Sequence, residues 1–230
     1  AIIAIRNVNK EKFKEAKNMG LVILGPDINV SNAMFTAIND TTIRFGLSAI
    51  KNVGHNIVAA ITDARRAHGE FSTLASFLEH VQARDLNKKS LEALIMAGAL
   101  DQFGERGLLL RNMERLLSHQ RTHADAEERR QGSLFGFSGE SSTLPDIALE
   151  EGPPATVAEK LKWEKDLLGL YVSGHPLEKI PRDEKTLTLA TANALRKGTQ
   201  VRVPILLAET RRILTKNGEP MAFVRFEDAD

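Results

Sequence analysis

The sequence predicts a mainly α-helical fold with small β parts. Apolar residues recur at intervals of three and four over most of residues 45–121, which is the spacing of an amphipathic helix face. Apolar and polar residues alternate clearly only in residues 199–230, which is typical of strands. Between these regions, residues 122–155 are rich in Gly, Ser and charged residues, so we expect a linker there.

The composition is that of an ordinary soluble globular protein. A length of 230 residues suits one large or two small domains, with 42% hydrophobic and 27% charged residues. No apolar run is long enough to span a bilayer, and no signal peptide opens the chain. The absence of Cys excludes disulfides and Cys-ligated zinc. Because the chain starts at Ala1 and stops within an expected strand region, we expect a fragment of a longer protein.

The first 44 residues read as a small mixed α/β piece. Asn9 is a good cap for a short helix that Gly20 ends. A buried strand follows it, and two further strands flank Asn39-Asp40, a pair of residues that favours a hairpin. The expected helix is Lys10–Met19, and the expected strands are Leu21–Leu24, Ala33–Ile38 and Thr41–Phe45.

A tight break interrupts helical spacing in residues 45–61. Asn52-Val53-Gly54 separates Leu47 and Ile50 from a second apolar stripe, so we expect two short helices joined by a hairpin. Gly54 takes a left-handed conformation freely, Asn52 tolerates one, and Val53 is expected in the core below. The amides of Gly54, His55 and Asn56 then open the second helix without intrahelical partners, which favours an anion near Lys51.

This stretch resembles the helix-hairpin-helix motif, which holds one DNA phosphate through hairpin amides and does not read bases. The motif usually has Gly at both ends of the hairpin, and Asn52 replaces the first one here. The alternative is a helical corner with a Gly break. The candidate DNA-binding residues are Lys51, Asn52, Val53, Gly54, His55 and Asn56, together with Lys88 and Lys89, which equally suit a solvated helix start.

The rest of residues 62–121 predicts further core helices. Asn87 caps one helix and Gly98 closes it, while Gly104-Glu105-Arg106 begins another. The apolar stripes are Phe71, Leu74, Phe77, Leu78 and Val81; then Leu91, Leu94, Ile95 and Met96; then Leu109, Leu110, Met113, Leu116 and Leu117.

Within the expected linker, Gln131 is followed by three large apolar residues, Leu134, Phe135 and Phe137. Such a cluster either docks on its own domain or fills a pocket on a partner. The stretch resembles the peptide with which bacterial replication proteins bind the sliding clamp. The resemblance implies that Gln131 contacts the pocket rim, while Leu134 and Phe135 enter an apolar pocket.

Beyond the linker, Pro153-Pro154 marks a restart and a helix follows, with Val157, Leu161, Leu167 and Leu168 on its apolar face. Alternation then predicts strands over 201–207 and 221–227, with a turn at 215–219 between them. Two long antiparallel strands do not make a stable domain, so we expect the opening of a small β-barrel.

Motifs for catalysis are absent from the sequence. Ser173 beside His175 lacks a Gly-x-Ser-x-Gly elbow, and there is no P-loop or Gly-x-Gly-x-x-Gly. His119 and His123 share a helix face without a zinc-protease pattern, so we expect them on the solvated surface rather than on a metal.

The order of these parts resembles the family of catalytic alpha subunits of bacterial DNA polymerase III, over nearly the whole chain. The resemblance implies the end of a fingers domain at 1–44, a helix-hairpin-helix DNA-binding domain at 45–121, a linker with the clamp-binding peptide at 122–155, a helical connector at 156–198 and the truncated start of an OB-fold at 199–230. Segments typical of the family are Gly25–Asn29, Ile43–Leu47, Leu91–Leu100 and Leu168–Leu177.

The same resemblance implies that this segment holds primer–template duplex through backbone phosphates and tethers the polymerase to the clamp during chromosome replication. It implies no enzyme activity of the segment alone and no cofactor, because the aspartates that bind Mg²⁺ lie upstream of it. Implied partners are DNA, the clamp and other replicase subunits in the bacterial cytoplasm, with no membrane. The alternatives are a stand-alone nucleic-acid-binding module and a structural scaffold whose Leu-Phe pair docks on its own helices.

Overall fold

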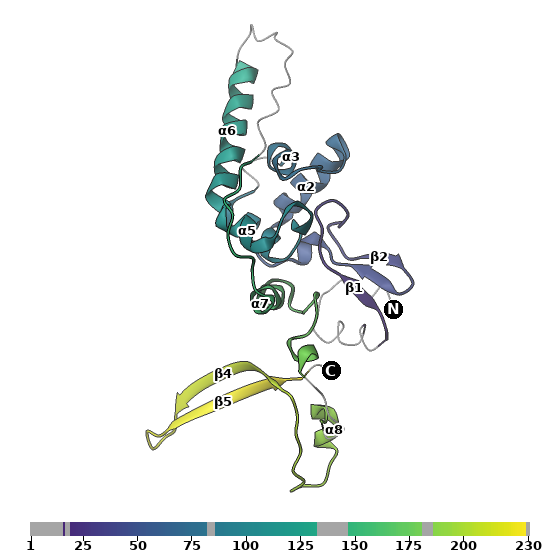
Figure 1. Ribbon diagram of the computed structural model, residues 1–230, viewed down its shortest axis with the longest axis vertical. Helices are drawn as coiled ribbons and strands as arrows, with labels where there is room; N and C mark the ends of the chain where they lie inside the picture. The colour runs from purple at the N-terminus through teal and green to yellow at the C-terminus, as the bar shows by residue number, and fades with distance from the viewer. Residues whose placement is uncertain (1–15, 17–18, 82–85, 133–146, 181–185, 229–230) are drawn as a thin grey trace. The chain divides into compact units, whose positions relative to one another are not determined.

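The chain forms two compact units, residues 1–172 and residues 173–230, and each is described here by itself (Figure 1). The predominance of helix agrees with the predicted fold class. The computed structural model describes residue 16 and residues 19–81, 86–132, 147–180 and 186–228.

A three-stranded sheet opens the first unit. Its strands are β1 (Val22–Leu24), β2 (Thr36–Asn39) and β3 (Thr42–Arg44), in the order β1-β3-β2, with β1 parallel and β2 antiparallel to β3. The hairpin at Asn39-Asp40 is confirmed, and Asn39 Oδ1 accepts a hydrogen bond from the Thr41 amide at 2.9 Å. The strand expected to be buried is not: only Ile23 is buried and Val22 is 53% exposed, because β1 is an edge strand with one face on the core. Most of the helix expected over 10–19 lies outside the described residues.

The helices of the first unit follow the predicted stripes. Phe71, Leu74, Phe77, Leu78 and Val81 are all buried, and the rings of Phe71 and Phe77 meet edge to face with centroids 5.4 Å apart. The helical elements are η2 (Leu47–Ala49), α2 (His55–His68), α3 (Leu74–His80), α4 (Lys88–Met96), η3 (Asp101–Phe103), α5 (Arg106–Arg111), α6 (Met113–Gly132) and α7 (Val157–Leu168).

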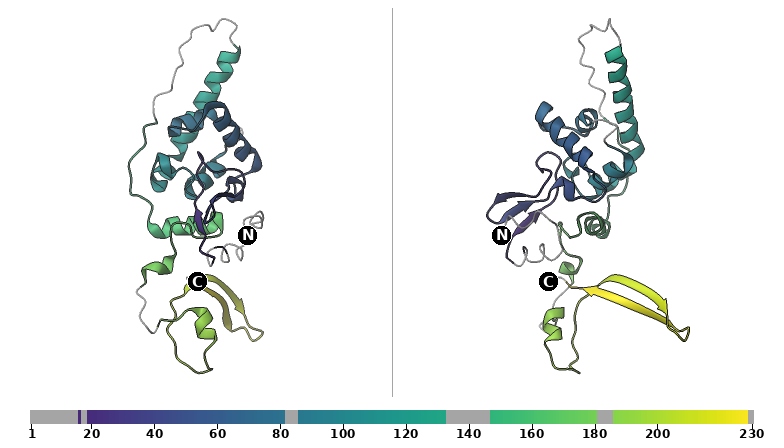
Figure 2. Two further views of the ribbon diagram at one scale, coloured as in Figure 1. Left: turned by 90° about the vertical axis from the view of Figure 1, so that its right-hand side faces the viewer. Right: turned by 180° about the vertical axis from the view of Figure 1, so that it is seen from behind.

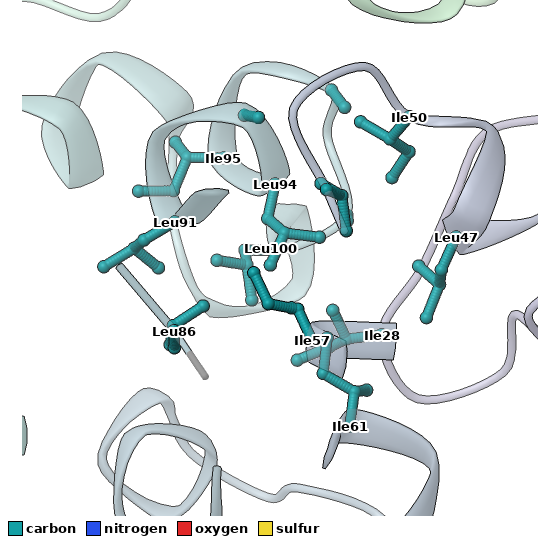
Figure 3. Packing of buried hydrophobic residues seen from close by; sticks show 14 of the residues in the cluster. Ile28, Leu47, Ile50, Ile57, Ile61, Leu86, Leu91, Leu94, Ile95 and Leu100 are labelled. Atoms are coloured by element: carbon teal, nitrogen blue, oxygen red, sulfur yellow. The ribbon is translucent and has the colours of Figure 1, made fainter. Parts of the chain in front are cut away.

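The core of this unit joins α2, α4 and the loops around them. Figure 3 shows Ile57 and Ile61 of α2 in one cluster with Leu94 of α4 and with Leu100, and all four are buried. Asn87 caps α4 by accepting the Ser90 amide hydrogen at 3.0 Å, as predicted. Gly98 follows α4 with a φ of 84°, which confirms its place at the helix end.

The third predicted stripe is divided between two helices. The chain breaks between α5 and α6 at Asn112, which is buried although it is polar. Beyond the break, α6 continues as helix to Gly132, well into the range expected to be a linker, and it can be followed in teal in Figure 2. The far side of that range also differs from a free linker: residues 147–155, which we call the strap, lie along α5 and the start of α6.

Helix α7 belongs to the first unit. Leu161, Leu167 and Leu168 are buried as predicted, but Val157 is 55% exposed because it stands in the first turn of the helix. Thr156 and Glu159 form a capping box at this end: Thr156 Oγ1 accepts from the Glu159 amide at 3.2 Å, and Glu159 Oε2 accepts from the Thr156 amide at 2.7 Å. The range 156–198 is therefore shared between the two units.

The second unit contains a long hairpin. Strands β4 (Leu206–Leu214) and β5 (Pro220–Glu227) pair antiparallel, after η4 (Pro176–Lys179) and α8 (Leu189–Asn193). The predicted turn is confirmed, with Thr215 donating its amide hydrogen to Glu219 at 2.8 Å and Gly218 at a φ of 81°. The first strand starts later than alternation predicted, so Val201 and Val203 precede it. The OB-type barrel stays a prediction.

Candidate functional site

The predicted hairpin is a single tight turn. The Val53 amide donates to the Ile50 carbonyl at 3.1 Å, and Asn52 between them has a φ of 70°. Asn52 is the only residue other than glycine with positive φ in the described part of the chain. Because Lys51 does not have positive φ, this is a type II turn, whose third position favours Gly or Asn.

Of the two residues expected to tolerate a left-handed conformation, only Asn52 adopts one; Gly54 has a φ of −77° and a ψ of 163°. One detail of the expected hairpin is wrong. The first of the two expected helices is only the 3₁₀ turn η2, since the chain leaves it at Ile50 in an extended conformation. Val53 is buried as predicted, and it belongs to the same apolar cluster as Ile50 and Ile57.

The backbone of the hairpin faces solvent around the buried Val53. Helix α2 starts after Gly54, which has no side chain to cap the first amides, and no acidic residue stands in its first turn. By contrast, α3, α4, α5, α7 and α8 each start after a residue whose side chain accepts an amide hydrogen. The amide end of α2 therefore keeps its partial positive charge. The exposed residues are Lys51, Asn52, Gly54, His55 and Asn56.

Glycine at position 54 is not required by the protein itself. Its backbone angles suit any residue, and a Cβ built there meets nothing within 4 Å. Gly46 is different, because a Cβ there would lie 2.5 Å from the carbonyl carbon of Met34. At Gly54 the missing side chain leaves the amides open to a group that approaches from outside.

The two predicted lysines lie on another element. Lys88 and Lys89 begin α4 and are exposed. Lys88 Nζ lies 2.5 Å from Glu114 Oε1, and this hydrogen bond and the charge of Glu114 raise the pKa of Lys88. Lys88 is therefore engaged with α6, while Lys89 is the more available of the two for a phosphate.

The predicted clamp-binding residues are mostly outside the described part of the chain. Gln131 lies in the last turn of α6. Leu134, Phe135 and Phe137 fall in residues 133–146, which the structure does not describe. Both flanks of that range, α6 and the strap, belong to the first unit.

Side chains just before α5, at its junction with α6 and in the first turn of α6 hold the strap. Asn112 exchanges two hydrogen bonds with the backbone of Glu150, and Arg115 Nη1 donates to the Ala148 carbonyl at 2.9 Å. Arg115 also pairs with the Glu150 carboxylate. At the far end the Ala155 amide donates to Glu105 Oε1 at 3.1 Å, beside Gly107, where a Cβ would lie 2.7 Å from the same nitrogen. Sequence reasoning missed this docking, although a polar Asn within the apolar stripe was a signal for it.

A buried ionic network was also missed. Arg106 is almost fully buried, and it lies 2.8 Å from Asp101 Oδ2 and 3.1 Å from Glu164 Oε1. Its Nη1 also donates to the Met96 carbonyl at 3.2 Å. Burial alone would lower the pKa of Arg106, but the bonds and charges of Asp101 and Glu164 outweigh it and raise that pKa. The network therefore joins α4, η3, α5 and α7.

Two of the histidines have structural roles. His175 Nδ1 accepts the Leu177 amide hydrogen at 3.2 Å at the start of η4. His119 was expected on the solvated surface, but its side chain is only 12% exposed, because α3 packs on α6 and brings Glu79 Oε1 to 3.3 Å from Nε2. Within the described ranges there is no group of three or more acidic, His or Cys side chains placed to hold a metal ion. Nor is any described helix long and apolar enough to cross a bilayer.

Comparison with known proteins gives one consistent result. A family profile described as "Helix-hairpin-helix motif" matches residues 20–108, which include the turn and α2. DNA polymerase III subunit alpha of Thermus aquaticus is 35% identical over 224 residues, covering 95% of this chain and 18% of the relative. The subunits of the same name from Saccharopolyspora erythraea and Pseudomonas aeruginosa are each 34% identical, over 100% and 94% of this chain. The chain spans about a fifth of the length of these relatives.

Proposed function

Since the chain belongs to the DNA polymerase III alpha-subunit family as a segment of it, we propose that it holds duplex DNA by its backbone phosphates and links the polymerase to the sliding clamp. The phosphate-binding element is the turn at Lys51–Asn56, and the clamp-binding element is the peptide from Gln131 to Phe137. Nucleotide transfer is proposed to belong to parts of the whole subunit other than this segment.

The observation that carries the DNA-binding proposal is the uncapped start of α2. Its first amides follow a glycine that neither the backbone conformation nor the packing requires. A phosphate oxygen accepts hydrogen bonds from such amides and is stabilised by the positive end of the helix. The positive charge of Lys51 stands beside the same amides and adds to this attraction.

The geometry supports contact with the DNA backbone rather than with bases. The turn is short and Val53 is buried, so the backbone amides around Gly54 lie at the surface beside the exposed residue Lys51. Amides that bind phosphates fix the position of DNA but carry no sequence information directly. The DNA partner is therefore proposed to be duplex of any sequence.

The clamp-binding proposal rests on the resemblance of the peptide, supported by how its flanks are held. The range 133–146 lies between α6 and the strap, and both are fixed to the unit that carries the DNA-binding turn. A clamp that binds Leu134 and Phe135 would thus be linked directly to this unit. Two weak contacts joined in this way reach an affinity about 10²- to 10⁴-fold above either one.

A titration against salt tests the DNA-binding proposal. The 230-residue chain is added to a labelled duplex, and fluorescence anisotropy is followed at increasing salt concentrations. We expect weak binding whose logarithm falls linearly with the logarithm of the salt concentration, because phosphate contacts release counterions. An affinity that does not change with salt contradicts phosphate contact, and so does a clear preference for one base sequence.

A further inference from the structure

We propose that α7, which follows the clamp-binding region in the chain, is part of the DNA-binding element. Glu164 and Leu167, the latter through its backbone carbonyl, are positioning residues that hold the turn at Lys51–Val53 in the conformation that binds a phosphate. The inference rests on the proposed function, and it names which remote groups set the geometry of that site.

A direct bond links the turn to α7. The Lys51 amide donates to the Leu167 carbonyl at 3.0 Å. Within the turn itself, the structure gives only the bond from the Val53 amide to the Ile50 carbonyl. Leu167 and Leu168 are buried in the same apolar cluster as Val53, so the last turn of α7 packs where the DNA-binding turn enters the core.

The last turn of α7 is itself fixed by the buried network. Glu164 lies one turn before Leu168, and its side chain is only 1% exposed. Its Oε1 accepts a hydrogen bond from Arg106 Nη1 at 3.1 Å, and its Oε2 accepts one from the Val172 amide at 2.8 Å. The Glu164 carboxylate therefore binds both α5 and the chain after α7. Its residue precedes Leu167 and its partner Val172 follows it, so Leu167 is held from both directions along the chain.

This link does more than stabilise the fold. A turn with Asn at positive φ relies on its surroundings, because asparagine adopts that conformation less readily than glycine. The bond from Lys51 to Leu167 fixes the residue immediately before Asn52. We therefore expect that even a shift of α7 that is too small to unfold the unit moves the amides of the turn.

Two matched pairs of variants test the inference. Glu164→Gln weakens the buried link between α5 and α7. Lys160→Gln removes a more exposed link from α7 to Glu105, the residue that caps α5, in which Lys160 Nζ lies 2.8 Å from Glu105 Oε1. Lys51→Pro deletes the amide donor, and Lys51→Ala keeps it while also removing the charge. Proline suits this position, because it is favoured second in a type II turn and Ile50 before it is extended.

The first readout is hydrogen exchange without DNA, measured by NMR. In Glu164→Gln we expect the Lys51 amide to exchange faster than in the unchanged chain, while the core amide of Ile61 stays protected. The second readout is DNA affinity. We expect Glu164→Gln to bind about 2- to 30-fold more weakly, and Lys51→Pro to bind about fivefold more weakly than Lys51→Ala. Lys160→Gln should change neither readout.

Unchanged Lys51 exchange and unchanged affinity in Glu164→Gln would overturn the inference. If Glu164→Gln does not fold, the comparison of Lys51→Pro with Lys51→Ala decides. Equal DNA affinities of these two variants would overturn the inference. Failure of the unchanged chain to bind DNA would instead count against the proposed function, because the exchange measurement needs no DNA. A purely structural role for Glu164 predicts equal loss of protection at Lys51 and Ile61, which also contradicts the inference.

Discussion

Asn112 and Glu150 exchange two hydrogen bonds although they are far apart in the chain. Asn112 Nδ2 donates to the Glu150 carbonyl at 3.0 Å, and the Glu150 amide donates to Asn112 Oδ1 at 2.8 Å. The side-chain amide thus acts as a short piece of strand backbone. It breaks the helical stripe at the junction of α5 and α6, and it fixes the strap on the unit that carries the turn proposed to bind DNA.

We predict that Asn112→Ala releases the strap. The substitution leaves the backbone groups of Glu150 without these partners, and we expect the free energy of unfolding to fall by about 1–3 kcal/mol in urea. Cleavage after Glu150 or Glu151 by a Glu-specific protease should become faster under native conditions. Arg115→Gln is the control, because it removes only half-exposed contacts with the strap and should have a smaller effect. Equal cleavage in all three proteins would contradict the role of Asn112.

We predict that Gly98→Ala is more destabilising than Gly169→Ala. Both glycines follow a helix with positive φ, 84° and 78°, so alanine is strained at either one. Only at Gly98 does the added Cβ also lie 2.3 Å from Arg106 Nη2, within the buried network. We expect a loss of about 1–2 kcal/mol for Gly169→Ala from the backbone alone. Thermal unfolding should show a clearly larger loss of stability for Gly98→Ala than for Gly169→Ala. Equal losses of stability would contradict tight packing of Arg106 against Gly98.

We predict an acid dependence of stability that involves Glu105. Burial raises the pKa of Glu105, but bonds from Lys160 and from the Ala155 and Leu108 amides outweigh it, so its pKa in the folded chain lies below the ordinary 4.5. A lowered pKa contributes stability above the unfolded-state value, and that contribution is lost as pH falls through the folded value. Between neutral pH and about pH 3, the free energy of unfolding measured in urea should therefore fall less steeply in Glu105→Gln than in the unchanged chain. Parallel curves would contradict this role.

We predict that the double substitution Leu134→Ala with Phe135→Ala abolishes binding to a sliding clamp. Each side chain is worth about 1.5–3 kcal/mol when buried in an apolar pocket, so losing both removes the anchor. Binding is measured by surface plasmon resonance with immobilised clamp, and the double variant should still bind DNA as before. If the unchanged chain does not bind the clamp, docking of the Leu-Phe pair on its own helices becomes the better interpretation.

Much of the first unit could be predicted from the sequence, because its signals are local. The stripe from Phe71 to Val81 has the period of a helix, and Gly98 ends α4 where a left-handed residue is needed. The turn at Asn52–Gly54 was also found from local signals. Local signals did not decide which residue of the turn is left-handed, since Asn and Gly both tolerate positive φ, and the structure places that conformation at Asn52.

The features that were missed depend on contacts between distant parts of the chain. Nothing near Glu164 in the sequence distinguishes it from the exposed charges of α7, and its burial depends on Arg106. The strap was assigned to a linker because it belongs to residues 122–155, a range rich in Gly, Ser and charged residues. Its place is set by Asn112, at the junction of α5 and α6, and by Arg115 of α6.

The most direct test of phosphate binding compares Gly54→Ala with Gly69→Ala, at the two ends of α2. Gly54 has ordinary backbone angles and open space, so alanine there should cost less than about 1 kcal/mol of stability. Gly69 has a φ of 85°, so alanine there should cost about 1–2 kcal/mol.

Affinity for duplex DNA should follow the opposite order. We expect Gly54→Ala to weaken binding by about tenfold, because its methyl group stands where a phosphate oxygen meets the amides, whereas Gly69→Ala should bind as the unchanged chain does. The measurement is a fluorescence anisotropy titration of both variants at one low salt concentration, with thermal unfolding in parallel. Undiminished DNA binding by Gly54→Ala would contradict the account.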